Sequence, residues 1–132
     1  MDNFFIITGI FSILIGSYLK YEHNHKNASK ITPKIAKHLI KCGAKVLDVR
    51  LPSEPGSVTR KNEKGEKVKI SINIPGKKIS KETLKNKGLI ETDIIITFCN
   101  SGTRARQAAD KLNKLGYKNV YYIVETFLSL QE

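Results

Sequence analysis

A cysteine, a glycine and an arginine occur within six residues of the sequence, at positions 99, 102 and 104 of this chain of 132 residues. Gly102 permits a tight loop, and Arg104 falls in the first turn of a predicted helix. The positive end of such a helix and the guanidinium both favour thiolate over thiol, and both attract an anion. The spacing therefore predicts a nucleophilic thiolate at Cys99 beside an anion-binding loop.

The loop backbone is predicted to form a cradle for that anion. We expect the backbone N–H groups of residues 100–105 to point toward the Cys99 sulfur. Besides Arg104, the residues of this cradle are Asn100, Ser101, Gly102, Thr103 and Ala105. The alternative is that Cys99 is only a small buried side chain, because free cysteines are among the most buried residue types. Cys42, at the end of another predicted helix, is interpreted in that second way.

A buried strand and a helix must hold the loop from its two sides. Residues 93–98 (DIIITF) predict the strand, and residues 103–115 the helix. The apolar face of that helix consists of Ala105, Ala108, Ala109, Leu112 and Leu115. A second apolar run at residues 46–49 predicts another buried strand, closed by Arg50, Leu51 and Pro52.

The remaining chain alternates between helical and strand patterns. The other elements expected are a helix at 33–42, a loop or hairpin at 53–69 with its turn at Lys64-Gly65, a half-buried strand through 68–74, a helical turn at 81–87, a strand at 120–124 and a short last helix at 125–130. Helices that alternate with short apolar strands predict an α/β fold with a central parallel sheet flanked by helices. Such sheets bind ligands beyond the carboxyl ends of their strands, which is where residues 98–106 fall.

The loop and its flanking segments resemble the rhodanese-like (sulfurtransferase) domain family. The C-x-x-G-x-R pattern that begins at Cys99 is similar to the active-site loop of that family. Residues 46–50 (VLDVR) resemble its L-D-V-R strand, residues 72–75 (INIP) its N-I-P segment and residues 116–121 (GYKNVY) its G-[FY]-x-x-V-Y strand entry. The resemblance covers about residues 31–124.

This resemblance implies a rhodanese-like domain and a sulfurtransferase activity. Members of the family move a sulfane sulfur from thiosulfate or a persulfide onto the active-site cysteine, and then to cyanide or a thiol. By this resemblance Cys99 and Arg104 are the catalytic residues, and Asp48 and Arg50 support neighbouring loops. The implied partners are a small anionic sulfur donor and a thiol acceptor, and neither a metal ion nor an organic cofactor is implied.

Two departures from the family pattern keep other functions open. The family's E-[FY]-x-x-G-H-I-x-G-A segment is replaced by Glu54-Pro55-Gly56 and a lysine-rich stretch at residues 59–69, and its late Gly-Gly is replaced by Val124-Glu125. One alternative is therefore a membrane-tethered binding module without turnover. A lesser alternative is a phosphatase or arsenate reductase of the same fold. Enzymes of that kind have a longer C-x5-R loop, whereas here four residues separate Cys99 from Arg104.

The charge balance favours anionic partners. Lys and Arg number 23 against 12 Asp and Glu, a net charge of +11. The basic stretch lacks interleaved aromatic residues, so no nucleic-acid binding is expected. The two cysteines are too few for a disulfide scaffold, and His23 and His25 lack further ligands at metal-binding spacing.

The N-terminal end differs from the rest of the chain. Residues 4–19 carry no charge and predict a membrane-anchor helix within residues 1–20. A polar linker at 21–30 and the rhodanese-like domain at 31–132 are expected to follow. Lys residues follow the apolar block and none precedes it, which predicts a single-pass anchor with the domain facing the cytoplasm.

Overall fold

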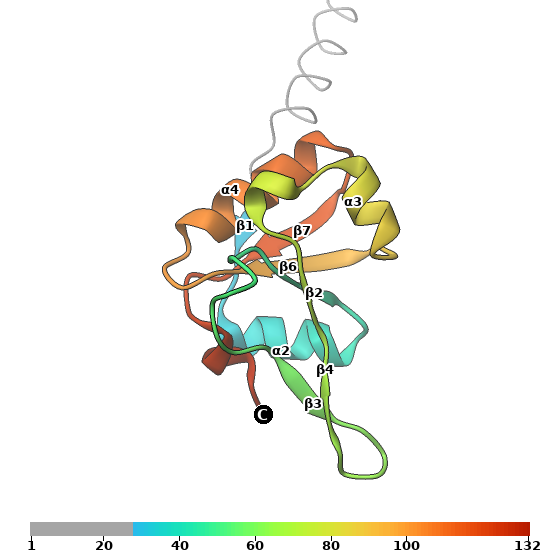
Figure 1. Cartoon of the computed structure of the whole chain (residues 1–132), viewed down its shortest axis with the longest axis vertical. Coiled ribbons are helices and arrows are strands. Elements are labelled where there is room, and N and C mark those ends of the chain that lie inside the picture. The colour runs from blue at the N-terminus through green and yellow to red at the C-terminus, as the bar shows by residue number, and fades with distance from the viewer. Residues whose placement is uncertain (1–27) are drawn as a thin grey trace, which may run out of the picture.

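A five-stranded sheet forms the centre of the computed structural model, which describes residues 28–132 (Figure 1). All four strand pairs of this sheet are parallel. In spatial order the strands are β1 (Ser29–Lys30), β7 (Asn119–Tyr122), β6 (Ile94–Phe98), β2 (Lys45–Asp48) and β5 (Ser71–Asn73). The parallel sheet predicted from the sequence is thus confirmed. The predicted membrane anchor lies outside the described residues.

The helices cover both faces of the sheet. They are α2 (Pro33–Lys41), α3 (Lys81–Asn86) and α4 (Thr103–Lys114), with short 3-10 helices η1 (Gly76–Lys78) and η2 (Phe127–Leu130). Figure 1 shows α3 and α4 on one side and α2 on the other. Within residues 28–132, no helix is both long enough and apolar enough to cross a membrane.

Side chains of the two central strands alternate between two cores. Leu47 and Ile95 pack into a cluster with the buried face of α4. Val46 and Ile96 pack into a second cluster with residues of α2 and η2. Burial on both faces explains why these strands appear as continuous apolar runs in the sequence.

Helices α2 and α3 begin at the capping residues predicted from the sequence. The Thr32 hydroxyl accepts a hydrogen bond from the Ile35 N–H at 3.2 Å, and Pro33 occupies the first helical position of α2. Ser80 begins α3 with a capping box in which Thr83 is the partner. Local chemistry therefore sets where these two helices begin.

The strand predicted through residues 68–74 is wrong, because two separate strands occupy this stretch. Its first part is β4 (Lys67–Lys69), which pairs with β3 (Thr59–Lys61) in an antiparallel hairpin. Its second part is β5, which joins the central sheet. The Val58 carbonyl accepts from the N–H groups of Ile70 and Ser71 at 2.9 and 3.3 Å, where the chain passes from one sheet to the other. At the ends of the described chain, β1 lies inside the predicted linker, and the last helix expected at 125–130 is the 3-10 helix η2.

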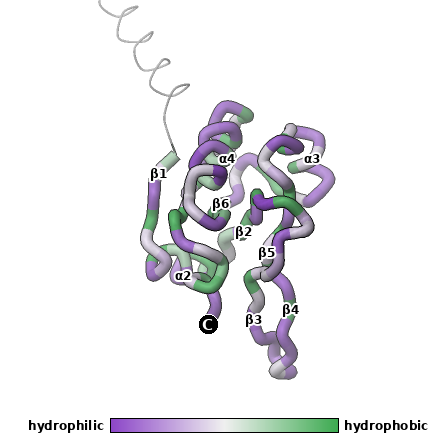
Figure 2. The backbone as a smooth tube through the Cα atoms, turned by 60° about the vertical axis from the view of Figure 1, so that its left-hand side comes forward, coloured by the Kyte–Doolittle hydropathy of each residue, from purple (hydrophilic) through white to green (hydrophobic). Residues whose placement is uncertain are grey.

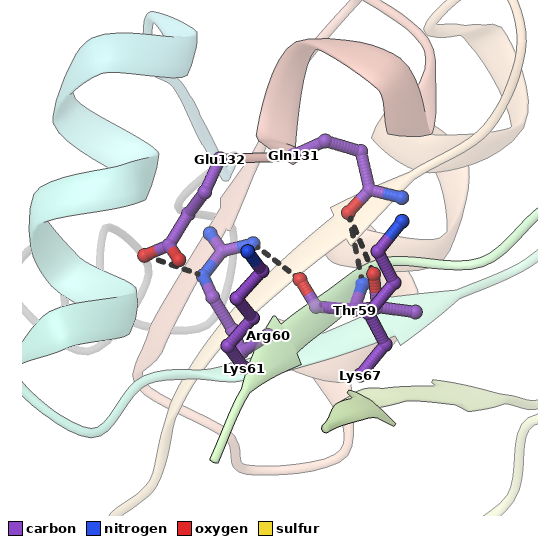
Figure 3. Close-up of a pocket in the computed structure, with 6 residues that line it drawn as sticks. All are labelled: Thr59, Arg60, Lys61, Lys67, Gln131 and Glu132. Atoms are coloured by element: carbon purple, nitrogen blue, oxygen red, sulfur yellow. Dashed lines mark hydrogen bonds and ion pairs between the residues drawn. The ribbon is translucent and has the colours of Figure 1, made fainter. Parts of the chain in front are cut away.

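The β3–β4 hairpin extends away from the sheet and is strongly polar (Figures 1 and 2). At its base, the Gln131 side chain accepts from the Thr59 N–H at 2.9 Å and donates to the Ser57 carbonyl at 2.8 Å. Arg60 forms an ion pair with Glu132 at 3.4 Å. These contacts surround a cavity of about 350 Å³ (Figure 3). The C-terminal residues therefore fasten the base of the hairpin.

Candidate active site

The predicted nucleophile lies at the carboxyl end of β6, where the chain turns into α4. Cys99 is completely buried. Gly102 is the N-cap residue of α4 and has a φ of 91°, in the left-handed region that favours glycine. A Cβ atom at this position would come within 2.7 to 2.9 Å of three Val124 atoms. Both the backbone conformation and the close approach of Val124 therefore require glycine in the loop.

Two backbone N–H groups converge on the Cys99 sulfur. The Gly102 N–H donates to Sγ at 3.0 Å, and the Ala105 N–H donates at 3.4 Å. Within residues 28–132 these are the two N–H donors to this sulfur, so the expectation that all of residues 100–105 contribute is wrong. Successive peptide units of a tight turn point in different directions, so few of them can face one atom. Ser101 is exposed on the loop, and Thr103 is exposed at the first position of α4.

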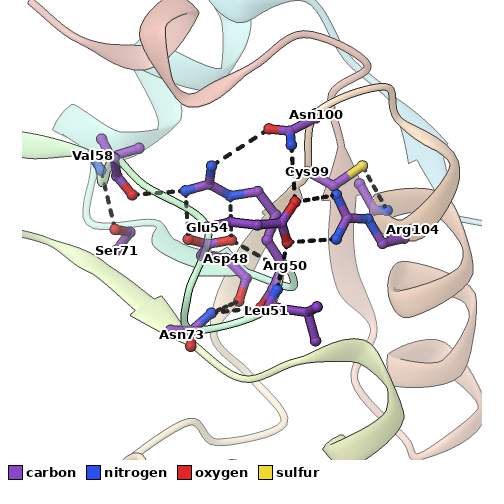
Figure 4. Close-up of polar contacts among 12 residues, drawn as sticks. Asp48, Arg50, Leu51, Glu54, Val58, Ser71, Asn73, Cys99, Asn100 and Arg104 are labelled. Carbon is purple, nitrogen blue, oxygen red and sulfur yellow. Dashed lines mark hydrogen bonds and ion pairs between the residues drawn. The ribbon is translucent and has the colours of Figure 1, made fainter.

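Arg104 forms a two-pronged ion pair with Glu54. Its two terminal nitrogens lie 2.7 and 2.9 Å from the two carboxylate oxygens (Figure 4). The hydrogen bond from Arg104, followed by one from the Leu51 N–H, lowers the pKa of Glu54 to about 2. The same pairing raises the pKa of Arg104, and the nearby Cys99 thiol adds a smaller effect. The guanidinium thus lies beside the sulfur, with its charge already balanced.

Glu54 is a site residue that the sequence analysis did not predict. It belongs to the loop after β2, whereas Arg104 follows β6, and the two strands are neighbours in register at Asp48 and Phe98. The available signal was the position of Glu54 just beyond a strand predicted to be buried, since the carboxyl ends of parallel strands meet at one edge of a sheet. Asn100 joins the pair, because its side-chain amide donates to Glu54 at 3.0 Å.

Asp48 and Arg50 form a buried ion pair behind the loop that carries Glu54. The Arg50 Nε and one terminal nitrogen each lie 2.9 Å from an Asp48 carboxylate oxygen. Arg50 also donates to the carbonyls of Pro55 and Gly56, at 2.9 and 2.7 Å. The hydrogen bond to Asp48 is the main cause that raises the pKa of Arg50. The two residues therefore contact the Glu54 loop, and their supporting role stays a prediction.

Two aromatic rings enclose the Arg50 guanidinium. Its central carbon lies 5.4 Å from the Phe98 ring centre and 5.2 Å from the Phe127 ring centre. The Arg50 side chain is only 2% exposed. Phe98 immediately precedes Cys99, so this stacking connects the Glu54 loop to the end of β6.

The described residues offer no metal site, since nowhere within 28–132 do three or more His, Cys, Asp or Glu side chains gather. What the loop provides is a thiol with two backbone N–H donors and an adjacent guanidinium. This arrangement stabilises negative charge on sulfur or on a small bound anion.

Comparisons with known proteins give matches to rhodanese-like and sulfurtransferase proteins. The model of the rhodanese-like domain family matches residues 32–130. A protein of Schizosaccharomyces pombe described as "Putative thiosulfate sulfurtransferase, mitochondrial" is 33% identical over 78 residues, which cover 57% of this chain and 54% of that protein. The chain thus spans about half the length of this curated relative.

Two solved structures have a similar fold. The polysulfide-sulfur transferase homodimer of Wolinella succinogenes superimposes with a TM-score of 0.58 at 22% identity, over 90% of this chain and 82% of that chain. The wild-type structure of EanB superimposes with a TM-score of 0.60 at 18% identity, over 77% of this chain and 25% of that one. At these identities the likeness concerns the fold alone.

Proposed function

Since the chain belongs to the rhodanese-like domain family, we propose that it is a sulfurtransferase that carries a sulfane sulfur on Cys99. The observation that carries this proposal is the convergence of the Gly102 and Ala105 N–H groups on the Cys99 sulfur, with the Arg104 guanidinium alongside. The donor is thiosulfate or a persulfide, and the acceptor is a thiol or cyanide.

The first half-reaction with thiosulfate is a displacement at sulfur. The Cys99 thiolate attacks the outer sulfur of thiosulfate, a new S–S bond forms, and the S–S bond of the donor breaks. Sulfite leaves with the electron pair of that bond, and Cys99 becomes a persulfide. Arg104 attracts the sulfonate group, while the two N–H groups stabilise the charge that remains on sulfur.

The second half-reaction restores the free cysteine. An acceptor thiolate attacks the outer sulfur of the persulfide, forms its own S–S bond and releases the Cys99 thiolate. One sulfur atom has then moved from donor to acceptor. The cycle requires neither an external oxidant nor a reductant, because each bond that breaks is replaced by an equivalent one.

A second candidate is a binding module without turnover. The observation in its favour is that Cys99 is fully buried and that both terminal nitrogens of Arg104 are bonded to Glu54. An incoming anion must compete with this carboxylate for the guanidinium. In the binding module the carboxylate stays in place and Cys99 never receives sulfur.

Intact-protein mass spectrometry after incubation with thiosulfate separates the two candidates. The full chain should gain the mass of one sulfur atom, and the Cys99→Ser variant should gain none. Cys42→Ser is the matched control, because Cys42 is the other cysteine. Cys42 is exposed, so the prediction that it is a small buried side chain is wrong. An unmodified wild-type chain supports the binding module, and an adduct that depends on Cys42 refutes the assignment of Cys99.

We also propose that residues 4–19 anchor the chain in a membrane as a single span, with the domain facing the cytoplasm. The support comes from the sequence: this block is uncharged, and Lys20, Lys26 and Lys30 follow it. The full chain should remain in the membrane fraction after alkaline carbonate extraction. Its release would remove the anchor, and cleavage of the domain by a protease outside sealed, correctly oriented vesicles would reverse the topology.

A further inference from the structure

The amino edge of the central sheet lies at the opposite end of the strands from Cys99 (Figure 1). Because β2, β6 and β7 are parallel neighbours, the segments that lead into them meet at this edge, at residues 41–45, 85–93 and 114–118. Neighbouring strands lie about 5 Å apart. The Asn119 side-chain amide donates to the Thr92 carbonyl at 3.4 Å, which joins two of the segments. The three segments, which we call the amino edge, therefore form one surface.

Positive charge predominates at the amino edge. Its acidic residues are Glu91 and Asp93, and the half-buried Asp93 carboxylate accepts a hydrogen bond from the Ile90 N–H at 3.0 Å. Its basic residues are all exposed lysines: Lys41, Lys45, Lys85, Lys87, Lys114 and Lys118. None of these lysines forms an ion pair with a residue of the described chain. The edge therefore presents positive charge that residues 28–132 do not neutralise.

Helix electrostatics explain only some of these lysines. A lysine in the last turn of a helix stabilises the negative end of the helix dipole, which accounts for Lys41, Lys85 and Lys114. Lys45 is the first residue of β2, and Lys118 immediately precedes β7, so neither has this role. The surplus of cations therefore indicates an anionic partner outside the chain.

An apolar side chain stands among the lysines. Ile90 is 60% exposed, and a tight turn fixes its position. Its N–H donates to the Asp93 carboxylate, and its carbonyl accepts from the Asp93 N–H at 3.0 Å. A surface of acidic lipids suits both features, since lysines attract the headgroups and an apolar side chain enters the layer beneath them. A small soluble anion would account for the lysines but not for the exposed isoleucine.

The position of β1 limits how far the domain can lie from the proposed anchor. β1 is parallel to β7, with Ser29 opposite Tyr121, so the chain enters the sheet from the amino side. The nine residues from 20 to 28 span at most about 30 Å, even when fully extended. Such a tether keeps the amino edge at a high local concentration near a lipid surface.

We propose that the amino edge is a docking surface for an anionic lipid bilayer. The lysines contact acidic headgroups, and Ile90 enters the headgroup layer. This docking is distinct from the proposed anchor, which supplies only the tether, and from the sulfur chemistry. It also orients the domain. β6 has five residues, about 17 Å in length, so Cys99 lies about two Debye lengths from the lipid at physiological salt. The site then faces water, where the acidic surface repels an anionic sulfur donor only weakly.

The test measures how close each end of the sheet comes to lipid headgroups. An uncharged fluorophore is attached to Cys42, which is exposed at the amino edge, in the full chain with Cys99→Ser. The vesicles contain a small share of lipid with a nitroxide on its headgroup, which quenches the fluorophore only near contact. Quenching should be about threefold or more stronger in phosphatidylcholine with about a quarter phosphatidylserine than in phosphatidylcholine alone.

A second label reports on the opposite end. The same fluorophore at Glu63→Cys in the exposed hairpin, with Cys42→Ser and Cys99→Ser, should be quenched weakly in both kinds of vesicle. This label distinguishes a defined orientation from a domain that tumbles on its tether, because tumbling would expose both labels to the nitroxide alike.

Two triple variants test the lysines. Lys45→Gln/Lys87→Gln/Lys118→Gln removes one cation from each segment of the amino edge. Each lysine near an acidic leaflet strengthens the attraction about fivefold, so this variant should lose most of the additional quenching of the Cys42 label. Lys61→Gln/Lys64→Gln/Lys67→Gln is the matched control, because it removes the same charge from the hairpin and should retain that quenching.

Three outcomes would overturn the inference: quenching of the Cys42 label that does not depend on phosphatidylserine, equal losses in the two triple variants, or a hairpin label quenched as strongly as the Cys42 label. The amount of protein held by phosphatidylcholine vesicles reports on the anchor separately. If both kinds of vesicle hold the chain but lipid charge has no effect, the docking surface fails and the anchor stands. If only acidic vesicles hold it, through the lysines of the amino edge, the anchor fails and the docking surface stands. None of these readings depends on whether Cys99 carries sulfur.

Discussion

The Cys99 loop and the β3–β4 hairpin differ in how firmly the protein holds them. Around the loop, Gly102 packs against Val124, and the buried Arg50 is bonded to Asp48 and stacked between two rings. Within the described part of the chain, no buried side-chain nitrogen or oxygen lacks a hydrogen-bond partner. The hairpin instead exposes every residue from 61 to 69 and is fastened only at its base.

This difference coincides with the pattern of likeness to the family. The segment that departs from the family's G-H-I pattern forms the hairpin, where a substitution disturbs few contacts. The C-x-x-G-x-R loop lies where several groups fix one geometry, so a substitution there disturbs many. Matched substitutions in the two regions should therefore have very different effects, and five predictions measure how different they are.

The largest expected difference in the free energy of unfolding is between the substitutions Arg50→Ala and Arg60→Ala. Arg50→Ala leaves the Asp48 carboxylate buried without its partner, which should lower the free energy of unfolding by about 3 to 5 kcal/mol. Arg60→Ala removes a partly exposed ion pair with Glu132, which should cost about 1 kcal/mol at most. Urea unfolding followed by circular dichroism measures both. Equal losses would mean that the Cys99 region is no more constrained than the hairpin.

A glycine pair tests the same contrast at the backbone. Gly102→Ala adds the cost of a left-handed residue to a collision with Val124, about 2 to 4 kcal/mol together. Gly65→Ala in the hairpin turn, with a φ of 79° and open space around it, should cost about 1 to 2 kcal/mol. Misplacement of the Gly102 N–H should also slow sulfur transfer about 10- to 100-fold. A Gly102→Ala enzyme with wild-type turnover would show that this N–H does not act on the sulfur.

Arg104 and Arg106 provide a comparison within one helix. Arg104→Ala should lower kcat/KM for thiosulfate about 10- to 100-fold, because a charge-assisted hydrogen bond contributes about 1.5 to 3 kcal/mol. Arg106→Ala, exposed on the same turn, should change it less than about twofold. Steady-state assays of thiocyanate formation decide the matter. A similar loss in both variants would mean that overall charge, not the position of Arg104, attracts the donor.

The Glu54–Arg104 pair predicts a particular pH dependence of stability. The pKa of Glu54 is about 2 in the folded chain, below its ordinary value of 4.5, so the pair stabilises the fold fully above the ordinary value. That contribution declines as the pH falls from 4.5 toward 2, because the unfolded chain takes up the proton first. The difference in unfolding free energy between wild type and Glu54→Gln should shrink over this range. A difference that stays constant from pH 6 to pH 3 would show that the ion pair does not stabilise the fold.

The smallest effect is expected from charges in the hairpin. Lys61→Gln, Lys64→Gln and Lys67→Gln should each change the free energy of unfolding by less than about 0.5 kcal/mol, because these side chains are exposed and screened by salt. Their kcat/KM values for thiosulfate should remain within about twofold of wild type. A larger change in activity would link the hairpin to the Cys99 loop and remove the contrast between the two regions.

Much of the fold could be predicted because its signals are local. The Thr32 and Ser80 caps, the apolar face of α4 and the buried runs of β2 and β6 each depend on neighbouring residues. The error at residues 68–74 has the same origin. Val68, Ile70, Ile72 and Ile74 alternate with polar residues without interruption, although the chain passes from the hairpin to the central sheet between them.

The site was less predictable, because its decisive contacts join distant segments. The cysteine, the glycine and the arginine occur in one short motif, so their proximity could be predicted. Glu54 meets Arg104 across 50 residues, and Arg50 meets Phe127 across a still longer stretch. No periodicity or capping rule connects such residues. The pairing of β2 with β6 brings the loops of Glu54 and Arg104 together, and the packing of η2 against the second core cluster brings Phe127 near Arg50.

The order of strands in the sheet has a consequence for the chain as it is synthesised. Among the strands of residues 28–132, β6 lies between β2 and β7, and β1 pairs only with β7, so the first of these strands depends on the last. A nascent chain that has just produced the Cys99 loop still has one edge of β6 unpaired and lacks Val124 over Gly102. Translation proceeds at about 5 to 20 residues per second, so this interval lasts on the order of seconds. Until residues 119–124 are available, Cys99 follows a strand that has one unpaired edge, and the loop after it lacks its packing partner Val124.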